Sequence, residues 1–471
     1  MDYDIVIAGA GPAGLCLARM LSGHGLRIAV VEQQKQEALE KPAFDGREIA
    51  LTQHSARFMR QLGLWERIKA LDPVALAPLK DAQVLNGPST FSMVIGREHS
   101  KTSELGWFSS NHLIRQAAYD CVQDSVAQHR DITLMSGKKV IQTHSDDQGA
   151  QLELDDGARL RCRLLVAADS RFSTIRRAMG IAADMHDFGR TMMVFMVTHA
   201  VPHEHMAWEW FDYGQTLALL PMNDDPATGM PRSSVVLTLP GHAIEQLMAM
   251  PDGEFGVEIT RRFGGRLGTM ALISTRHTYP LVGVYPHRLV APHFACVGDA
   301  AVGMHPVTAH GFNFGLRSVE TLSQLVLRAQ ASGQDIASAA LLHTYERRHR
   351  LATRPLYLVT MAIAKLYTTE SLPAQFLRMA ALHVGQRFTP FKRIVAASIA
   401  GKVYAPKPLV SSRAFSHDVR ERREGMHGAP ATVSTTAMPV CEILLARRIP
   451  CQSTLSRMRQ AGPVAHAATG C

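Results

Sequence analysis

The chain has 471 residues, of which 46% are hydrophobic and 19% charged, a composition typical of a globular protein large enough for two domains. Its net charge of +9 favours anionic partners, but the basic residues are dispersed among few aromatic ones, so we expect no nucleic-acid binding. The seven cysteines form no CxxC pair and no histidine cluster has ligand spacing, which argues against a structural metal and for a reducing compartment.

Neither a signal peptide nor a membrane-spanning helix is expected. The first apolar run begins almost at Met1, where a signal peptide would have to stand. The most apolar segment, residues 355–364, has about half the length that a membrane-spanning helix needs. We therefore expect a cytoplasmic protein.

The first motif is a glycine-rich turn near the N-terminus. Residues 3–8 form a continuous apolar run, typical of a buried parallel strand, and Gly9, Gly11 and Gly14 follow at GxGxxG spacing. Gly9 permits a tight turn, Gly11 lets the backbone approach a pyrophosphate, and Gly14 lets the next helix pack closely on the strand. The motif predicts a site for an adenine dinucleotide.

Three side chains further along are candidates for the same ligand. A second apolar run, residues 26–31, ends at Glu32, at the usual interval for an acid that binds a ribose hydroxyl. Arg47 is a candidate contact for a phosphate or a flavin edge, mainly because of the family resemblance described below, and Arg115 projects from a predicted helix at 111–122. The alternative for both arginines is a solvated surface position. At this point NAD and FAD fit equally well.

The middle of the chain changes from alternating strands and helices to mainly strands. Residues 72–106 carry prolines, glycines and short alternating runs, and residues 187–282 contain the longest series of predicted strands. We assign these two segments to a substrate domain. The dinucleotide-binding domain then consists of residues 1–71, 107–186 and 283–340.

Two features inside these domains need separate interpretation. Short runs at 132–134, 140–143 and 151–154 predict a small antiparallel meander before the next buried strand, residues 164–168. In the substrate domain, the sequence Trp-Glu-Trp at 208–210 reads as part of a strand. For it, core packing is favoured over a position in the substrate pocket.

A second dinucleotide-type element lies nearly 300 residues after the first. A buried strand at 294–297 runs into Asp299, an acid placed to hold the polyhydroxyl ribityl chain of a flavin. The next helix begins at Gly311, and its N-terminal dipole near Asn313 can face the pyrimidine edge of a flavin ring. This second element favours FAD over NAD.

Together these motifs resemble the flavoprotein aromatic hydroxylases of the p-hydroxybenzoate hydroxylase fold. The branch that the chain looks most like is the ubiquinone-biosynthesis hydroxylases, of the 5-demethoxyubiquinol 5-hydroxylase type. The resemblance implies an α/β fold: a Rossmann-like FAD-binding domain, an inserted mainly-β substrate domain and a helical C-terminal region. It extends over about residues 1–400 and depends on Gly9–Gly14 with Glu32, Arg47–Leu51, Asp169–Arg176, Gly298–Ala301, His305–Pro306 and Gly311–Arg317.

The sequence departs from the family pattern at four positions. Ser170 follows Asp169 where the family usually has glycine, Ala309 and His310 stand in place of a glycine and a glutamine, and Ser318 in place of an aspartate. We expect flavin binding to survive these departures. Their effect should fall on docking of the reductant and on control of flavin movement.

The resemblance implies FAD held by the first glycines and Glu32, with Asp299 and residues 311–313 along the ribityl chain and ring. Reduced flavin and O2 would form a C4a-hydroperoxide that hydroxylates a polyprenylated phenol or quinol. No second GxGxxG is present, so NAD(P)H would bind only transiently as reductant, or the electrons would come from another donor. The alternatives are a hydroxylase of a soluble aromatic compound and a binding protein that has lost its flavin, and the intact glycines and acids argue against the latter.

Two histidines near the second element are the candidates for a catalytic role. His305 and His310 are placed to hydrogen-bond the phenol or the flavin and to tune proton transfer, since histidine titrates near neutrality. The alternative is that they only shape the loop. The cofactor carries the oxygen chemistry, so no nucleophile–base triad is needed.

The C-terminal part has a different character. Residues 341–401 predict helices, with apolar positions between 376 and 388 beside several basic residues. This pattern fits either packing on the protein's own core or a peripheral contact at the inner face of the membrane, alone or with other ubiquinone-biosynthesis proteins. Residues 402–471 are expected to be poorly ordered.

Overall fold

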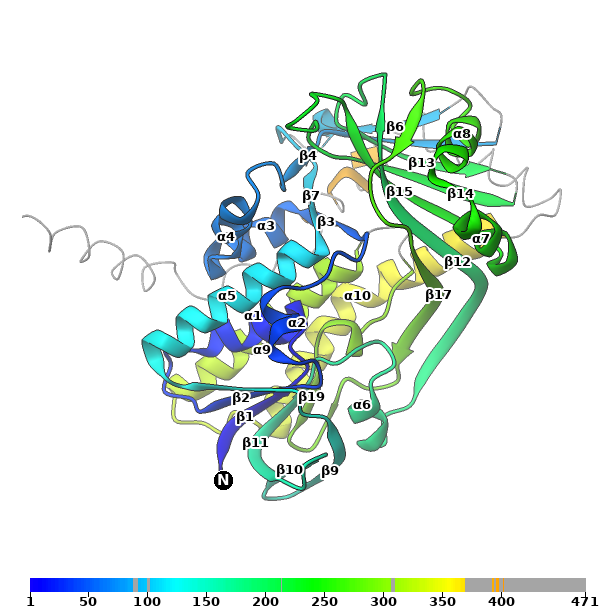
Figure 1. Cartoon of the computed structure of the whole chain (residues 1–471). Coiled ribbons are helices and arrows are strands. Elements are labelled where there is room, and N and C mark those ends of the chain that lie inside the picture. Colours follow the sequence, from blue (N-terminus) through cyan, green and yellow to red (C-terminus); the bar gives the residue numbers. More distant parts are fainter. Residues whose placement is uncertain are drawn as a thin grey trace, which may run out of the picture. The chain divides into compact units, whose positions relative to one another are not determined.

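The fold is known from a computed structural model (Figure 1). The amphipathic positions predicted at 376–388 and the tail at 402–471 lie outside the residues that it describes. Among the described residues no helix is long and apolar enough to span a membrane, and no three His, Cys, Asp or Glu side chains gather as a metal site. The described residues are 1–87, 92–99, 102–212, 214–305, 310–368, 392–393, 395–397 and 401.

The first sheet has a parallel centre in which apolar runs are buried on both faces. Its parallel strands are, in spatial order, β19 (Phe294–Cys296), β11 (Arg159–Ala167), β1 (Tyr3–Ala8), β2 (Ile28–Glu32) and β8 (Ile132–Ser136). The helices α1 (Pro12–Leu21), α5 (Asn111–His129) and α9 (Gly311–Ala331) pack against one another beside the sheet (Figure 1). This strand–helix alternation is the predicted Rossmann-like arrangement.

One prediction about this sheet is wrong. The run at 132–134 was expected in an antiparallel meander, but it lies in β8, which pairs in parallel with β2. The antiparallel part consists of β9 (Val140–Asp146) and β10 (Gly149–Leu154), which extend from β11. The short β18 (Val290–Ala291) completes the other edge.

The second sheet is larger and mainly antiparallel. On one face it packs against α7 (Gly241–Ala249) and α8 (Asp252–Arg262) around a core that includes Phe195, Trp210 and Phe255. β17 (His277–Pro286) pairs with β12 and leads back toward the first sheet. The order of the other strands is β16 (Met270–Leu272), β12 (Ala183–His199), β15 (Arg232–Leu239), β14 (Gln215–Pro221), β13 (Met206–Asp212), β5 (Asp81–Asn86) and β6 (Ser92–Gly96).

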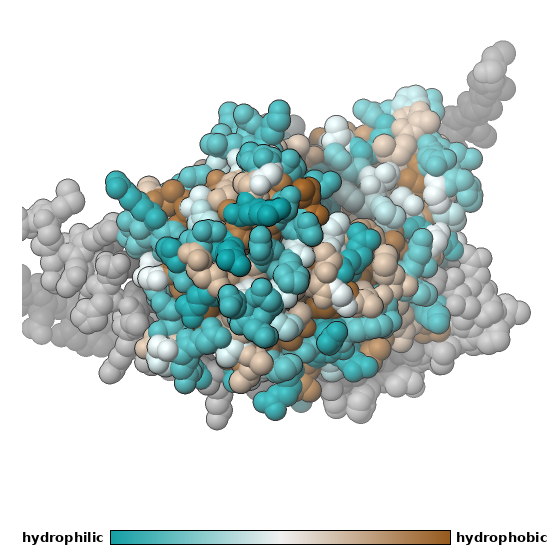
Figure 2. All heavy atoms as spheres, turned by 90° about the horizontal axis from the view of Figure 1, so that it is seen from below, coloured by the Kyte–Doolittle hydropathy of each residue, from teal (hydrophilic) through white to brown (hydrophobic). Residues whose placement is uncertain are grey.

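A third, small sheet is formed by strands that stand before and after β5 and β6 in the sequence. It consists of β3 (Glu48–Thr52), β7 (Gly106–Ser110) and β4 (Ala77–Leu79). The remaining elements are α2 (Gln36–Glu40), α3 (Gln53–Leu62), α4 (Leu64–Leu71), η1 (Arg97–His99), α6 (Thr174–Ala178), η2 (Gly298–Ala300) and α10 (Ala339–Thr368). On the face shown in Figure 2, apolar side chains are interspersed with hydrophilic ones, as on most protein surfaces.

The glycine turn after β1 is fixed by close backbone contacts. Gly9 has a φ of +113°, and a Cβ there would lie 2.5 Å from the carbonyl oxygen of Ala168, at the end of β11. A Cβ on Gly14 would lie only 2.0 Å from the carbonyl oxygen of Gly9. By contrast, a Cβ on Gly11 would meet no protein atom within 4 Å. Gly9 and Gly14 are therefore required by packing, whereas Gly11 faces open space.

This difference predicts opposite effects on stability. Gly14→Ala should lower the free energy of unfolding by about 1–3 kcal/mol, the usual cost of inserting an atom into a packed interior. Gly11→Ala is the matched control and should leave stability nearly unchanged, since Gly11 has a φ of −70° and free space around it. Denaturant unfolding of the two variants measures the difference, and equal losses would contradict it.

Candidate functional site

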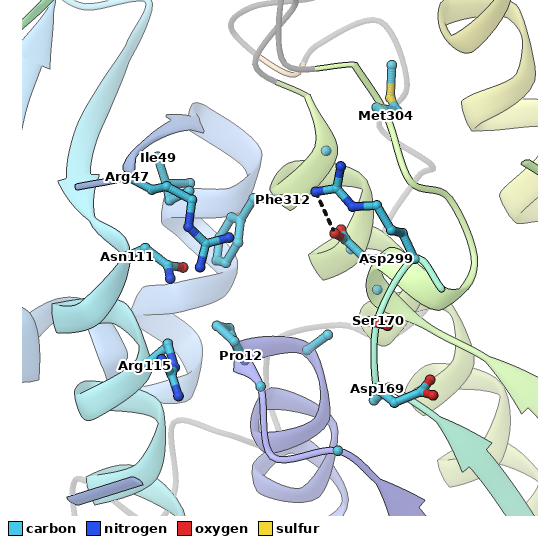
Figure 3. A pocket seen from close by; sticks show the side chains of 18 of the residues that line it. Pro12, Arg47, Ile49, Asn111, Arg115, Asp169, Ser170, Asp299, Met304 and Phe312 are labelled. Atoms are coloured by element: carbon cyan, nitrogen blue, oxygen red, sulfur yellow. Dashed lines mark ion pairs between the residues drawn. The ribbon is translucent and has the colours of Figure 1, made fainter. Parts of the chain in front are cut away.

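A cavity of about 910 Å³ begins at the glycine turn and extends to the second sheet. In Figure 3, Arg47, Asn111 and Arg115 approach it from one side, and Ser170 and Asp299 from the other. The predicted site residues that line the cavity are Gly9, Gly11, Glu32, Arg47, Arg115, Asp299, His305 and Gly311. The other predicted site residues, Gly14, His310 and Asn313, are not part of its lining.

Glu32, at the end of β2, is held in place by the backbone. Its two carboxylate oxygens accept hydrogen bonds from the N–H groups of Ala10 at 2.7 Å and Gln34 at 2.8 Å. Arg115, on α5, donates to the side-chain oxygen of Gln34 at 2.7 Å. An acid and a cation thus stand together beside the N-terminus of α1, where a helix dipole favours phosphate groups.

Arg47 is oriented by an ion pair with Asp45. The guanidinium group donates to one Asp45 oxygen at 2.6 and 3.0 Å, and Asn111 donates to the same oxygen at 2.8 Å. Burial raises the pKa of Asp45, but Arg47 and these hydrogen bonds lower it more, so the carboxylate stays charged. The Arg47 cation also lies 5.3 Å from the ring centre of Tyr279, whose hydroxyl donates to the Asp45 carbonyl.

The second predicted element forms the opposite wall. Asp299, in η2, is 44% exposed and forms an ion pair with Arg171 at 3.6 Å, which the dashed line in Figure 3 marks. The hydroxyl of Ser318, which stands where the family usually has aspartate, accepts from the N–H of Gly298 at 2.9 Å. This serine therefore fixes the turn that presents Asp299 to the cavity.

Asn313 and His310 do not line the cavity, in contrast to the other predicted residues of the second element. The Asn313 side chain accepts from the N–H of Thr52 at 3.0 Å and donates to the carbonyl of Ala50 at 2.8 Å, so it joins α9 to β3. His310 is buried at the start of α9, with its ring 5.9 Å from that of Phe314. The sequence interval from Asp299 could not distinguish these orientations from one toward the cavity.

His305 lines the cavity and packs edge-on against Phe188, with ring centres 4.5 Å apart. Burial lowers the pKa of His305 to about 4. The ring is therefore neutral at physiological pH, and the expectation that it titrates near neutrality is wrong. In the neutral form one ring nitrogen donates a hydrogen bond and the other accepts one.

The far end of the cavity has an apolar wall contributed by the second sheet. Met192 and Val194 of β12, Leu220 of β14 and Val236 of β15 belong to it. A wall of this kind suits an aromatic or prenylated compound rather than a second nucleotide.

Two acidic residues of this end were not among the predicted site residues. Glu48 begins β3 and accepts a hydrogen bond from Ser110, and Glu209 projects from β13 into the cavity. Burial raises the pKa of each carboxyl group to about 8. The signal for Glu209 was an acid between two tryptophans in a strand. Trp210 packs in the core, as expected, and Glu209, the residue before it, must face the other way.

The lining fits a flavin dinucleotide. Gly11 leaves room next to the N-terminus of α1, Glu32 lines the cavity at the end of β2, and Asp299 supplies an acceptor for a polyhydroxyl chain. The apolar wall continues from this part of the cavity, so a ring placed at Asp299 would adjoin a second, apolar ligand. Residues of both dinucleotide-type elements therefore line one cavity.

Comparison with known proteins agrees with this geometry. Residues 2–357 match the FAD binding domain family. The chain is 40% identical over 405 residues to the ubiquinone hydroxylase UbiM of Neisseria meningitidis, covering 85% of each protein. It is 30% identical to the ubiquinone hydroxylase UbiL of Rhodospirillum rubrum, covering 86% of this chain and 91% of that one.

Among solved structures, the fold is similar to that of p-nitrophenol 4-monooxygenase PnpA from Pseudomonas putida, with a TM-score of 0.66 and 18% identity. The match covers 86% of this chain and 98% of the other. It confirms the expected fold, a Rossmann-like FAD-binding part with a mainly-β part. The cavity fits FAD, the family model matches most of the chain, and two relatives are at least 30% identical to it. The chain therefore belongs to the FAD-binding family of aromatic hydroxylases.

Proposed function

We propose that the protein hydroxylates the ring of a polyprenylated ubiquinone precursor, such as a demethoxyubiquinol, with O2 as the oxygen source. The observation that carries the proposal is the continuity of the cavity, which joins the dinucleotide site to the apolar wall of the second sheet. The printed function of the two ubiquinone hydroxylases supports the same substrate class. A soluble aromatic substrate is the alternative that the first experiment below distinguishes.

The roles of the site residues follow from their positions. Gly9 and Gly14 shape the turn, Gly11 admits the pyrophosphate, and Glu32 binds a ribose hydroxyl. Arg47 and Arg115 are oriented cations for the phosphates or the ring edge.

At the other end of the flavin site, Asp299 accepts hydrogen bonds from the ribityl chain and Gly311 lets that chain pass the start of α9. Neutral His305 hydrogen-bonds the ring or the substrate. Asn313 acts by fixing β3, and His310 by shaping the start of α9.

Bound FAD supplies electron transfer and the activation of O2, and the protein's task is to position the substrate and to exclude water. The apolar wall does both, because it offers few groups to which water can hydrogen-bond. NAD(P)H binds only transiently as the reductant, since the cavity already accounts for both dinucleotide-type motifs.

Rescue of quinone synthesis tests the function directly. Expression of this chain should restore ubiquinone in bacterial cells that lack one ring hydroxylase of the pathway, measured as quinone in lipid extracts. The variant Gly14→Ala, which distorts the flavin turn, is the control and should restore less. If no deletion strain is rescued while the purified protein is yellow with FAD, the soluble aromatic substrate becomes the better assignment.

Asp299 gives a test of the flavin site. Asp299→Ala should lower the FAD content of the purified protein at least about tenfold, because a hydrogen bond to a charged group contributes about 1.5–3 kcal/mol. Absorbance at 450 nm relative to protein measures the content. Asp147→Ala, in the exposed turn between β9 and β10, is the matched control and should change nothing. Equal FAD content in both variants would show that Asp299 does not hold the flavin.

We infer further that α10 contacts the membrane surface. Leu351, Leu358 and Val359 are 70%, 55% and 51% exposed on this helix, and Arg347 and Arg354 are exposed beside them. Apolar side chains next to cations are the composition of a helix that lies in an anionic lipid surface. A lipid-bound substrate is reached most easily from that surface.

Vesicle sedimentation tests this contact. Replacing Leu351, Leu358 and Val359 by serine should reduce binding to vesicles that contain phosphatidylglycerol, and 0.5 M salt should weaken wild-type binding through screening of the arginines. Val257→Ser is the control, because Val257 is 72% exposed on α8. Equal binding by the triple variant and the wild type would remove α10 from the contact.

A further inference from the structure

We propose that Glu209 accepts the proton of the substrate's phenolic hydroxyl group as the ring is hydroxylated, and is therefore the general base of the reaction. The proposal rests on the proposed function and names the residue that makes the phenol reactive. A phenolate donates electrons to an electrophilic oxygen far better than a phenol does. A base in contact with the hydroxyl group therefore accelerates the oxygen transfer.

The position of Glu209 in β13 directs its carboxyl group into the apolar wall. Side chains alternate along a strand, and Trp210 faces the core formed with α8. Across the strand pairs, Glu209 lies opposite Ala218 of β14 and Val84 of β5. Neither neighbour can ionise, so Glu209 is an isolated acid in the part of the cavity that would hold an aromatic ring.

The carboxyl group lacks a partner of its own. Within the described parts of the chain, no group forms a hydrogen bond or ion pair with the carboxyl group of Glu209, whose backbone is paired with β14 and β5. Glu48, the other carboxyl group at this end, already accepts a hydrogen bond from Ser110. Glu209 is half-buried and its carboxyl group lines the cavity, so a ligand that fills the cavity would cover it, and the group is then placed for a donor that arrives with that ligand. A phenolic hydroxyl is such a donor.

Its basicity suits this task. Burial alone raises the pKa of Glu209 to about 8, which brings it closer to that of a phenol, about 10 for tyrosine. His305, with a pKa near 4, is a much weaker base. The other charged or titratable groups that line the middle and far end of the cavity are Arg47, Glu48, Asp299 and Arg171.

The proton transfer is balanced without a further reactant. The O–H bond of the phenol breaks, an O–H bond forms on a Glu209 oxygen, and the electron pair stays on the phenolate. No electron changes hands in this step. After the ring carbon has received oxygen in the proposed hydroxylation, its hydrogen leaves as a proton to solvent and the ring becomes aromatic again. Glu209 then returns its proton to the phenolate oxygen, so that the product leaves as a neutral diol and the carboxylate is restored.

The test uses the full chain with FAD, NAD(P)H and O2, and two probes: 2-geranylphenol and a ring-fluorinated, more acidic analogue of it. Glu209→Gln should reduce product formation from 2-geranylphenol by about 100-fold, the usual contribution of a general base, with FAD content unchanged. The loss should shrink several-fold with the fluorinated phenol, which ionises without help. Glu254→Gln, exposed on α8, is the matched control and should behave as wild type.

The pH dependence of the rate distinguishes a base from a residue that only supports the fold, because loss of a structural contact would not change the pH at which the rate rises. The wild-type rate should rise as the pH increases through about 8, because Glu209 must be deprotonated to accept a proton. Glu209→Gln should lose this rise, and Glu48→Gln should keep it. If Glu48→Gln removes the rise instead, or if Glu209→Gln keeps both rate and profile, the assignment to Glu209 is wrong.

Stability against pH provides a measurement without substrate. The pKa of Glu209 is raised from 4.5 to about 8 in the folded protein, so the folded state binds a proton that the unfolded chain releases between these values. Wild-type stability should therefore fall as the pH rises through this range, and Glu209→Gln should be the more stable protein at pH 9. Identical unfolding curves at pH 9 would place the carboxyl group in water and overturn the proposal.

These outcomes distinguish a failure of the hydroxylase function from a failure of the role given to Glu209. If the wild-type protein hydroxylates neither probe and rescues no deletion strain, the proposed function fails, and the role of Glu209 fails with it. If the wild type is active but Glu209→Gln is equally active, only the assignment of the base fails.

Discussion

The site depends on one backbone contact, the approach of Gly14 to Gly9. It brings the first turn of α1 against the end of β1, and Gly9 in turn lies against Ala168 at the end of β11. No side chain larger than hydrogen fits at either glycine. The carboxyl ends of β1 and β11 are thereby held together, and β2 pairs with β1 on its other side. The residues at the ends of these three strands, Glu32 of β2 among them, therefore line the same cavity.

The second sheet supplies the complementary constraint. Its strands carry a core on one face and a cavity wall on the other, and the change of face occurs from one residue to the next. Trp210 stabilises the packing with α8, whereas Glu209 and Phe211 belong to the wall. One strand thus contributes to the core and to the cavity wall, and the burial of its apolar neighbours offsets the cost of placing a carboxyl group in an apolar surface.

Local sequence predicted what local physics determines. The glycine spacing, the strand before it and Glu32 were identified because each has a steric or hydrogen-bonding reason within about 30 residues. The pairing of β8 with β2 was not predicted, because the sequence of a short strand does not indicate which strand it pairs with. The orientation of Asn313 and the pKa of His305 depend on neighbours more than 100 residues away in sequence, which spacing cannot reveal.

The Asn313 side chain also binds the edge of a strand. Among the strands that the structure describes, β3 is an edge strand of the small sheet and pairs with β7 alone. Exposed edges invite pairing with other chains, and proteins generally cover them. The carboxamide of Asn313 accepts from Thr52 and donates to Ala50, so it stands where the peptide group of a neighbouring strand would be. Within the described residues, a helical side chain thus occupies two backbone groups of β3 that a further strand would otherwise bind.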